Sequence, residues 1–428
     1  MLSREDNELM CRVGRGTPMG EVMRHFWMPA LLSSELPESG GDPVHVELLN
    51  ENLVAFRDNN GRVGLLDEMC CHRGASLTIG RVENCGIRCI YHGWLFAADG
   101  TVLETPNVAD SQLKTRFKAK AYPVREAGGV VWAYLGDASK MPTFPDFPAL
   151  TAPKEKVLAT FGIFGCNYVQ VLEGLLDSSH LSLLHQSQLR STNLPDIAFV
   201  KKTSHMQFDM APRIEVEETE FGLHYGAIRQ VDGQAETNIT GFISPCFILN
   251  PNDMTLITVP LTDEKTGFYL IAYDGESRYG EEPLASQHLK ATGFDLPTLE
   301  AFGMTRKTFD TVARPRRANG FNQDRVSVRA GHFTGLPGLT PEDLVVAVSS
   351  GGIRDRSTEH LSTADAAIAK MYRVLLKSAR QVMQGDMPIA YGKSVALLRG
   401  RREKLPQGTD WRTLVPEHKP LSSQAQVA

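Results

Sequence analysis

The chain has 428 residues, which is long for a single hydrophobic core, so we expect two domains. Hydrophobic residues make up 42% and charged residues 22%, as in ordinary globular proteins, and the net charge of −5 gives no support for a nucleic-acid-binding surface. No run of residues approaches the roughly 18 apolar residues of a membrane span. The charged N-terminal segment lacks the apolar region of a secretory signal, so we expect a cytoplasmic protein.

The first third of the chain predicts one helix and then many short strands. Residues 17–32 predict the helix, because Thr17 is a good N-cap, Pro18 suits the first helical position and apolar residues follow at helical spacing. Between residues 43 and 136, short apolar runs alternate with turn residues, and Asp99-Gly100 marks the turn of a hairpin. We therefore expect an all-β domain in this region.

The remaining chain predicts a second, mixed domain. Residues 141–156 are rich in proline and form the expected linker. Residues 167–185 have a helical pattern, and long antiparallel strands are predicted within 213–231 and 236–261. Ser362 and Asp365 have the spacing of a capping box, which predicts that a C-terminal helix begins there.

Four of the seven cysteines lie between residues 70 and 94, together with two histidines. Cys70 and His72 form a C-x-H pair, Cys89 and His92 form a C-x-x-H pair, and sixteen residues separate His72 from Cys89. Each of two short loops therefore offers one thiolate and one imidazole. A zinc site with two cysteines and two histidines usually takes both sulfurs from one loop. The mixture found here instead suits a 2Fe–2S cluster with two cysteines on one iron and two histidines on the other, and zinc is the alternative.

The other cysteines are not expected to bind metal. Cys71 is out of step with Cys70, and Cys85 has no histidine at either of the two spacings. Cys11, Cys166 and Cys246 have no metal-binding neighbours in the sequence. We expect each of these five to be a small buried side chain.

A second metal site is predicted in residues 173–185, EGLLDSSHLSLLH. Glu173, Asp177 and His180 have i, i+4, i+7 spacing, which places them on one stripe of a helix. His185 lies well off that stripe, so we expect a kink or a helix end near residue 182. Two histidines and a carboxylate form the facial triad of non-haem iron(II) enzymes, which leaves positions open for oxygen and substrate. The alternative is a helix with two unrelated histidines.

Together the two motifs resemble those of the Rieske non-haem iron oxygenases. The C-x-H and C-x-x-H pairs, the second followed by Gly93-Trp94, are similar to the Rieske domain of that family. The pattern E-x3-D-x2-H-x4-H after CNYVQVLEG resembles its mononuclear iron segment, and TPMGEVMRHFWMPALL looks most like the phthalate dioxygenase branch. The resemblance covers most of the chain. It implies a cluster held by Cys70, His72, Cys89 and His92, and a mononuclear iron held in part by His180 and His185.

The resemblance also implies the fold. We expect an α+β protein, in which an all-β Rieske iron–sulfur domain is joined to an α+β catalytic domain with a curved antiparallel sheet wrapped around helices. The expected bounds are 1–26 for an N-terminal helical segment of the catalytic part, 27–140 for the Rieske domain, 141–156 for the linker and 157–428 for the catalytic domain. Because this branch has α subunits only, a homotrimer or a hexamer is expected.

The third iron ligand of the family is an aspartate far downstream. The candidates here are Asp343, Asp355 and Asp324. The family pattern is an acidic pair that leads into an apolar run, and Glu342-Asp343 matches it, so Asp343 is the expected ligand. A surface carboxylate or a helix cap is the alternative for each candidate.

The family gives Asp177 a separate catalytic role. It connects a cluster histidine of one subunit with an iron histidine of the next, which here means His92 of one chain and His180 of its neighbour. A carboxylate bonded to the second nitrogen of a metal-bound histidine also orients that ligand. Glu173 is expected to be structural or a weaker partner of the same kind.

The activity implied is that of a terminal oxygenase component, which uses O2 to hydroxylate an aromatic, carboxylated substrate. Nothing in the sequence resembles a nicotinamide or flavin site, so electrons from NADH are expected from a separate flavin and iron–sulfur reductase.

Arg213 or Arg229, on predicted strands, could bind the substrate carboxylate, although outward surface positions are the alternative. The basic runs 314–317 and 399–402 are expected to be solvated surface or to face an acidic redox partner. The alternative functions are O-demethylation or monooxygenation in the same family, a Rieske electron carrier, and a zinc-stabilised binding module.

Overall fold

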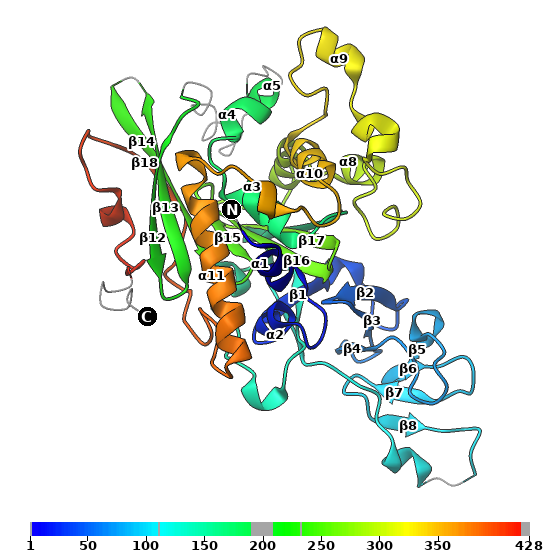
Figure 1. Cartoon of the computed structure of the whole chain (residues 1–428). Coiled ribbons are helices and arrows are strands. Elements are labelled where there is room, and N and C mark those ends of the chain that lie inside the picture. Colours follow the sequence, from blue (N-terminus) through cyan, green and yellow to red (C-terminus); the bar gives the residue numbers. More distant parts are fainter. Residues whose placement is uncertain (1, 110–111, 190–208, 232, 421–428) are drawn as a thin grey trace.

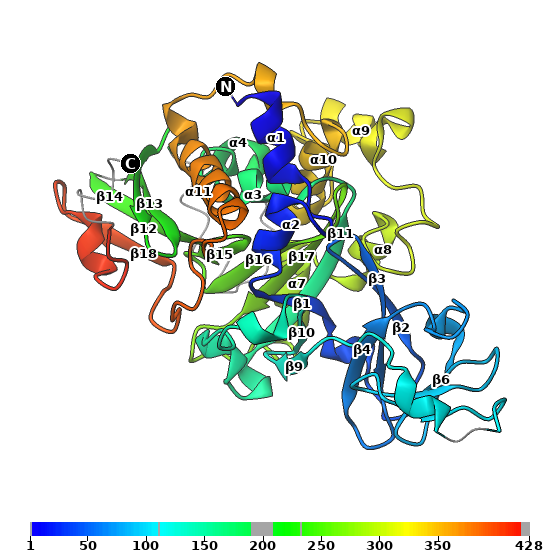
Figure 2. The same ribbon diagram turned by 60° about the horizontal axis from the view of Figure 1, so that its bottom comes forward.

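The computed structural model describes residues 2–109, 112–189, 209–231 and 233–420 (Figure 1). The described strands form four antiparallel sheets: two small sheets in a lobe at one end of the molecule, a large sheet in its body and a third small sheet between them (Figure 2). The described α-helices lie in the body (Figures 1 and 2). This arrangement confirms the predicted combination of an all-β domain with an α+β domain.

The lobe contains two small sheets whose strands follow one another in chain order. One core cluster of the lobe includes Phe56, Trp94 and Phe96, whereas Val46, Leu53 and Leu65 of the same sheets belong to the large core of the body. The predicted hairpin is confirmed, because Gly100 turns the chain with a positive φ of 84° between two paired strands. The two sheets are β2 (Val44–Leu48), β3 (Glu51–Arg57) and β4 (Val63–Asp67), and β5 (Arg81–Glu83), β6 (Gly86–Arg88), β7 (Leu95–Ala97) and β8 (Val102–Glu104).

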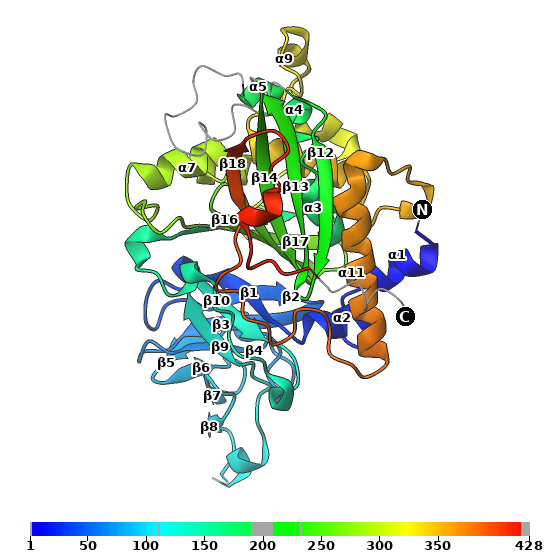
Figure 3. The same ribbon diagram turned by 90° about the vertical axis from the view of Figure 1, so that its left-hand side faces the viewer.

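The body is built on an eight-stranded sheet with the order β11-β17-β16-β15-β14-β13-β12, in which β18 also pairs with β14 (Figure 3). From β12 to β17 consecutive strands are neighbours, as the long antiparallel runs in the sequence predicted, whereas β11 pairs with β17 at the edge opposite β12. These strands are β11 (Leu158–Phe164), β12 (Arg213–Thr219), β13 (Gly222–Val231), β14 (Gln234–Ile243), β15 (Phe247–Asn250), β16 (Met254–Thr262), β17 (Lys265–Ala272) and β18 (Arg401–Leu405).

Helices from distant parts of the chain pack on this sheet. The contacts of α3 are with β16 and β17, those of α11 are with β12 and β13, and α10 packs against α3. The N-terminal α1 and α2 contact α11, so the start of the chain packs on a helix from its C-terminal part (Figure 2). The helices are α1 (Arg4–Cys11), α2 (Pro18–Met23), α3 (Tyr168–Leu176), α4 (Leu181–Leu184), α5 (Gln186–Leu189), α7 (Leu284–Thr292), α8 (Leu296–Ala301), α9 (Arg325–Arg329), α10 (Leu339–Ser349) and α11 (Ala366–Met383). No described helix is both long and apolar enough to cross a membrane.

The helix predicted for residues 17–32 is only partly correct. Thr17 caps α2 as expected, since its hydroxyl accepts a hydrogen bond from the Gly20 N–H, but α2 ends at Met23. Residues 27–32 form β1, which pairs with β10 (Val130–Tyr134) at the edge of a three-stranded sheet that also contains β9 (Val124–Ala127). A proline inside a helix removes a hydrogen bond, whereas an edge strand tolerates Pro29.

The predicted start of the C-terminal helix is confirmed. The Ser362 hydroxyl and the Asp365 carboxylate cap the chain reciprocally, and the Ser362 N–H donates to Asp365 Oδ2 over 2.7 Å. A single 3-10 turn (Thr363–Asp365) then leads into α11. Residues 141–156, the predicted linker, contain only short 3-10 turns and irregular chain.

Candidate metal centres

Two loops of the lobe bring the first predicted ligand set together with the same backbone geometry. The Cys70 N–H donates to the Ala75 carbonyl, and the Cys89 N–H donates to the Trp94 carbonyl, both over 2.9 Å. Each cysteine carbonyl in turn accepts from the glycine four residues later, Gly74 or Gly93. Both glycines have positive φ, 70° and 77°, which explains why glycine occupies each turn.

The side chains of these loops converge as a cluster site requires. Cys70 and Cys89 are buried, and burial raises the pKa of the Cys70 thiol to about 11, an effect that the nearby Cys89 reinforces. The His72 and His92 rings lie 4.6 Å apart between centroids, and His72 stacks on Trp94. Two buried sulfurs and two adjacent imidazoles at the end of a lobe fit a 2Fe–2S cluster with mixed ligands.

The remaining cysteines separate into two groups. Cys11, Cys166 and Cys246 are buried, as expected of small apolar side chains. Cys71 is exposed and Cys85 is partly exposed, so the prediction that both are buried is wrong. The tight turn that directs Cys70 and His72 inward leaves the intervening Cys71 pointing outward.

In the body, His180, His185 and Asp343 form a group that could hold one metal ion, with one ligand atom of each within 4.8 Å of the others. Asp343 Oδ1 lies 3.2 Å from His185 Nε2 and 3.6 Å from His180 Nε2. Two imidazoles and one carboxylate are the donor set of the facial triad.

The electrostatics of this group favour a positive charge. Burial opposes protonation of His185, but Asp343 and Glu342 outweigh burial and raise the pKa of its imidazole to about 10. Burial alone would raise the pKa of the Asp343 carboxyl, but His185 and His180 beside it hold that pKa below its usual value. Burial lowers the pKa of His180, although Asp343 and Asp177 act in the opposite direction. The donor set therefore fits a divalent cation.

Glu342 supports this group in a way that the sequence analysis did not foresee. Its side chain is fully buried, and Oε2 lies 2.7 Å from His185 Nδ1. The Thr334 hydroxyl donates to Oε1 over 2.6 Å, so both carboxylate oxygens are occupied. A carboxylate on the second nitrogen fixes the tautomer and orientation of a ligand histidine. The only signal in the sequence was the acidic pair itself, in which Glu342 was treated as part of a pattern.

The segment from α3 to α5 is interrupted twice, whereas a single kink or helix end near residue 182 was predicted. The α3 helix ends at Leu176, and Asp177 adopts an extended conformation as its C-cap. Asp177 Oδ1 accepts hydrogen bonds from the Ser179 N–H and hydroxyl, and from the His180 N–H. The break therefore precedes His180 rather than falling near residue 182, and a helix end at Leu184 also precedes His185. These two interruptions turn both imidazoles toward one point.

Asp177 and Glu173, expected to share a helical stripe, have different surroundings. Asp177 Oδ2 lies 3.8 Å from His180 Nδ1, a buried atom without a hydrogen-bond partner. Glu173 instead forms buried ion pairs with Arg356 and Arg354, and it accepts a hydrogen bond from the Tyr372 hydroxyl. Those contacts connect α3 with α11 and with residues 354–356, which is the structural role expected of Glu173.

The other two candidates for the third ligand lie at helix ends. Asp324 caps α9 through the N–H groups of Val326 and Ser327. Asp355 caps the 3-10 turn Arg356–Thr358 through the Ser357 N–H. Neither belongs to the His180–His185–Asp343 group.

The structure brings neither predicted substrate arginine to the metal group. Arg213 is exposed on β12 and pairs with Glu215. Arg229 is buried on β13, but its guanidinium donates to the Ser178 carbonyl and hydroxyl and to the Asp209 carbonyl. Arg229 therefore lies behind Ser178, with donors on all three guanidinium nitrogens engaged.

A cavity of about 130 Å³ lies beside the metal group and is lined by Asp177, His180, His185 and Asp343. A second opening of about 330 Å³ reaches Asp177, His180 and Asp343 from the side of α10.

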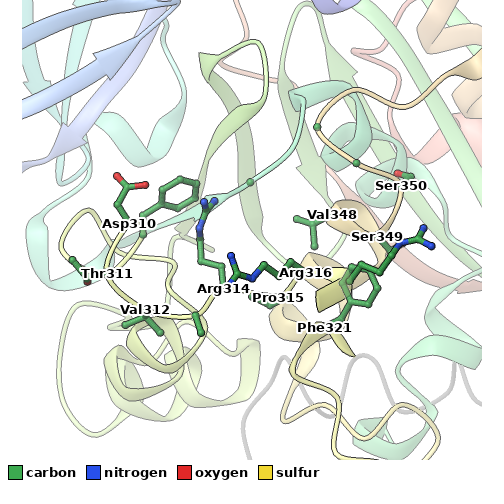
Figure 4. Close-up of a pocket in the computed structure, with 16 residues that line it drawn as sticks. Asp310, Thr311, Val312, Arg314, Pro315, Arg316, Phe321, Val348, Ser349 and Ser350 are labelled. Atoms are coloured by element: carbon green, nitrogen blue, oxygen red, sulfur yellow. The ribbon is translucent and has the colours of Figure 1, made fainter. Parts of the chain in front are cut away.

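A larger cleft of about 850 Å³ contains Arg314, Arg316 and none of the metal group (Figure 4). In that cleft the Arg314 guanidinium lies 3.7 Å from the centroid of the Phe309 ring. The basic run 314–317 thus belongs to a separate surface cleft.

Known proteins resemble this chain along most of its length. A family model described as "Rieske [2Fe-2S] domain" matches residues 26–123, and one described as "LigXa C-terminal domain like" matches residues 133–427. The phthalate 4,5-dioxygenase oxygenase subunit of Pseudomonas putida is 38% identical over 92% of this chain and 90% of that protein. The 5,5'-dehydrodivanillate O-demethylase oxygenase subunit of Sphingobium sp. is 30% identical over 93% of this chain and 85% of that protein. A crystal structure of dicamba monooxygenase bound to dicamba has the same fold, with a TM-score of 0.56 at 19% identity over 85% of this chain and 98% of that one.

Proposed function

The chain belongs to the Rieske non-haem iron oxygenases, and on this premise we propose that it is a terminal oxygenase component that hydroxylates a small aromatic substrate. Electrons come from NADH through a separate flavin and iron–sulfur reductase. The observation that carries the proposal is a buried group of two histidines and one aspartate beside a cavity, in a chain that also has a Rieske domain.

Each part of the chain has a distinct role in this proposal. Cys70, His72, Cys89 and His92 hold the 2Fe–2S cluster in the domain at 27–140, and His180, His185 and Asp343 hold the iron in the domain at 157–428. When bound, iron in such a site supplies the activation of O2 while positions remain open for substrate. Glu342 keeps His185 in one tautomer, and the cavity walls orient the substrate and exclude water.

O-demethylation is the second candidate reaction, because a relative with 30% identity over most of the chain is named as an O-demethylase subunit. Both reactions use the same group of residues. The test is oxygen consumption by the purified protein with a surrogate reductase, NADH and a panel of aromatic compounds that includes aryl methyl ethers. We expect substrate-dependent oxygen uptake only when the reductase is present, and released formaldehyde would identify demethylation. NADH oxidation by this chain alone would contradict the need for a reductase.

The position of the lobe supports electron transfer between chains. Strands β5–β8 and α4 lie at opposite ends of the molecule in two perpendicular views (Figures 1 and 3). Ile90 and Tyr91 are exposed beside His92, and Val346 and Leu361 are exposed at the opening that reaches Asp177. Apolar surface of this kind is often buried between subunits. In the proposed homotrimer or hexamer, Asp177 of one chain connects His180 with the partner subunit's His92.

Mixed oligomers give a direct test of this arrangement. Cys70→Ser chains lack a cluster and Asp343→Ala chains lack the iron site, so each variant alone should be inactive. If electrons cross between chains, oligomers that contain both variants should recover activity, because an intact cluster then lies beside an intact iron site. Mixtures of either variant with wild-type chains should stay active and serve as the control. If oligomers that contain both variants are nevertheless inactive, electrons travel within one chain.

Asp177→Asn tests the connection itself. Asparagine keeps an oxygen that can accept from the Ser179 and His180 N–H groups, so the fold and both metal centres should survive. Electron delivery should fail, because an amide does not hold two imidazoles as a carboxylate does. We would reduce the cluster chemically, add O2 and substrate, and follow reoxidation of the cluster by absorbance. The matched control is Asp324→Asn, an exposed helix cap. Wild-type reoxidation in Asp177→Asn would assign Asp177 a purely structural role.

A further inference from the structure

The cavity beside His180, His185 and Asp343 is small. Its volume of about 130 Å³ is close to that of an engineered protein cavity of about 150 Å³ that binds benzene. One aromatic ring therefore fills most of this volume, and the second opening of about 330 Å³ adjoins it at Asp177, His180 and Asp343. Apolar side chains suited to a ring line much of the cavity: Leu181, Leu256, Phe268, Leu270, Phe294 and Leu339.

A polar wall faces this apolar surface, and uncharged side chains form it. Tyr225 on β13 lies opposite Thr240 on β14, and Asn238 is on the same face of β14 two residues earlier. Asn252, from the turn between β15 and β16, completes this part of the lining. All four side chains belong to buried residues of the sheet and its turn.

The two asparagines of this wall are incompletely bonded. Asn238 is 3% exposed and Asn252 is 6% exposed, and the side-chain oxygen of each is buried with no hydrogen-bond partner among the described residues. Buried polar groups are nearly always paired, so an unpaired amide in a cavity wall indicates a site where a ligand or water provides the partner. Because no described group bonds to either amide oxygen, each asparagine can present an acceptor or, after a flip of the amide, a donor to the cavity.

The charges in the cavity argue against an anionic substrate. Among its described lining residues are the carboxylates of Asp177 and Asp343, but no lysine or arginine. A divalent metal ion would be matched by these two carboxylates, and none of the described lining residues supplies a positive charge for a third. A carboxylate moved from water into such a site loses its hydration without gaining an ion pair. Arg229 is not among the described lining residues, and hydrogen bonds to Ser178 and to the Asp209 carbonyl hold its guanidinium behind Ser178.

We propose that Asn238 and Asn252 form a specificity subsite that binds an uncharged, hydrogen-bonding substituent, such as an amide or a hydroxyl, on a single aromatic ring. This inference rests on the proposed function, because it assumes that the cavity beside the metal group holds the substrate. It also distinguishes this chain from a relative named for phthalate, which is a dianion.

Benzamide and benzoate are suitable probes because they have nearly the same shape and differ in charge. Their affinities for the metal-loaded protein would be measured by calorimetry without O2 or reductase, so that no turnover occurs. We expect benzamide to bind at least about 10-fold more tightly than benzoate. Benzoate binding as tightly as benzamide, or more tightly, would overturn the proposal, and this wild-type comparison requires no variant.

Asn238→Leu and Asn252→Leu then locate the subsite. Each keeps the approximate volume of the side chain and removes its hydrogen bonds, so each should weaken benzamide binding by about 10-fold. Benzoate binding should change little. Asn60→Leu, an exposed substitution in the lobe, is the matched control and should leave both affinities unchanged. Unchanged benzamide affinity in both folded cavity variants would overturn the assignment, and Asn→Ala substitutions serve where leucine prevents folding.

The outcomes also separate this inference from the proposed function. Preferential benzamide binding that depends on Asn238 and Asn252, without any reductase-dependent oxygen uptake, would support the subsite and refute the oxygenase activity. Oxygen uptake with benzoate as a better substrate than benzamide would support the activity and refute the subsite.

Discussion

The two candidate metal centres are built in different ways. The cluster residues lie in two loops of the lobe, between Cys70 and His92, and each loop repeats the same pair of backbone hydrogen bonds. The iron residues come from α10 and from the broken segment after α3, with Glu342 as a buried support. A centre made from local turns can be recognised from spacing alone, whereas a centre made across helices depends on how those helices pack.

Loss of a cluster ligand should have the largest effect. Cys70→Ser should abolish the 2Fe–2S absorbance, because the thiolate is a direct ligand in a buried loop. Cys71→Ser is the matched control one residue away, and its exposed side chain should be dispensable. The measurement is the visible spectrum with iron and sulfide content. A variant Cys71→Ser that lost the cluster while Cys70→Ser kept it would reverse the assignment.

The second largest effect is expected for Asp343→Ala, and it should concern the mononuclear iron centre only. Removal of a carboxylate 3.2 Å from His185 Nε2 should lower affinity for the mononuclear iron by more than about 100-fold, since loss of supporting residues alone costs about 10–100-fold. The cluster spectrum should stay intact. Metal analysis after dialysis provides the measurement, with Asp355→Ala as the control at an exposed cap. Loss of iron in Asp355→Ala but not in Asp343→Ala would show that Asp355 is the third ligand.

Glu342→Ala tests whether the support of the iron centre matters as much as its ligands. The His185 ring would lose its partner at Nδ1, so affinity for iron should fall by about 10–100-fold, less than in Asp343→Ala. Glu342→Gln keeps an oxygen at the same place and should lose less. Iron titrations of the three variants would give the order. An effect of Glu342→Ala on the cluster rather than on the iron would contradict the separation of the two centres.

The smallest effects are expected for glycine substitutions that compare the two cluster loops. Gly74→Ala meets nothing within 4 Å, so its cost is the positive φ alone, about 1–2 kcal/mol of unfolding free energy. An added Cβ at Gly93 would also lie 2.7 Å from Pro106 Cγ, so Gly93→Ala should cost more. Urea unfolding of both variants would measure the difference. Equal losses would mean that Pro106 shifts without cost.

Several features followed from the sequence alone because they depend on near neighbours. The four cluster residues were predicted from loop spacing, and the caps at Thr17 and Ser362 from the residue types that satisfy free N–H groups. The hairpin turn at Asp99-Gly100 and the antiparallel sheet followed from turn residues and apolar runs. The resemblance to known oxygenases indicated the order of the two domains and the role of His180 and His185.

Only the tertiary structure decided which distant groups meet. The acidic pair favoured Asp343 over Asp324 and Asp355 by resemblance alone, and of these three the packing of α10 against α3 brings only Asp343 to the histidines. The same packing buries Glu342 against His185, and the partners of Arg229 keep that residue out of the cavity. Residues 27–32 became a strand because β10 was available to pair with them. Spacing determines what a segment can present locally, whereas burial and contact depend on partners that lie far away along the chain.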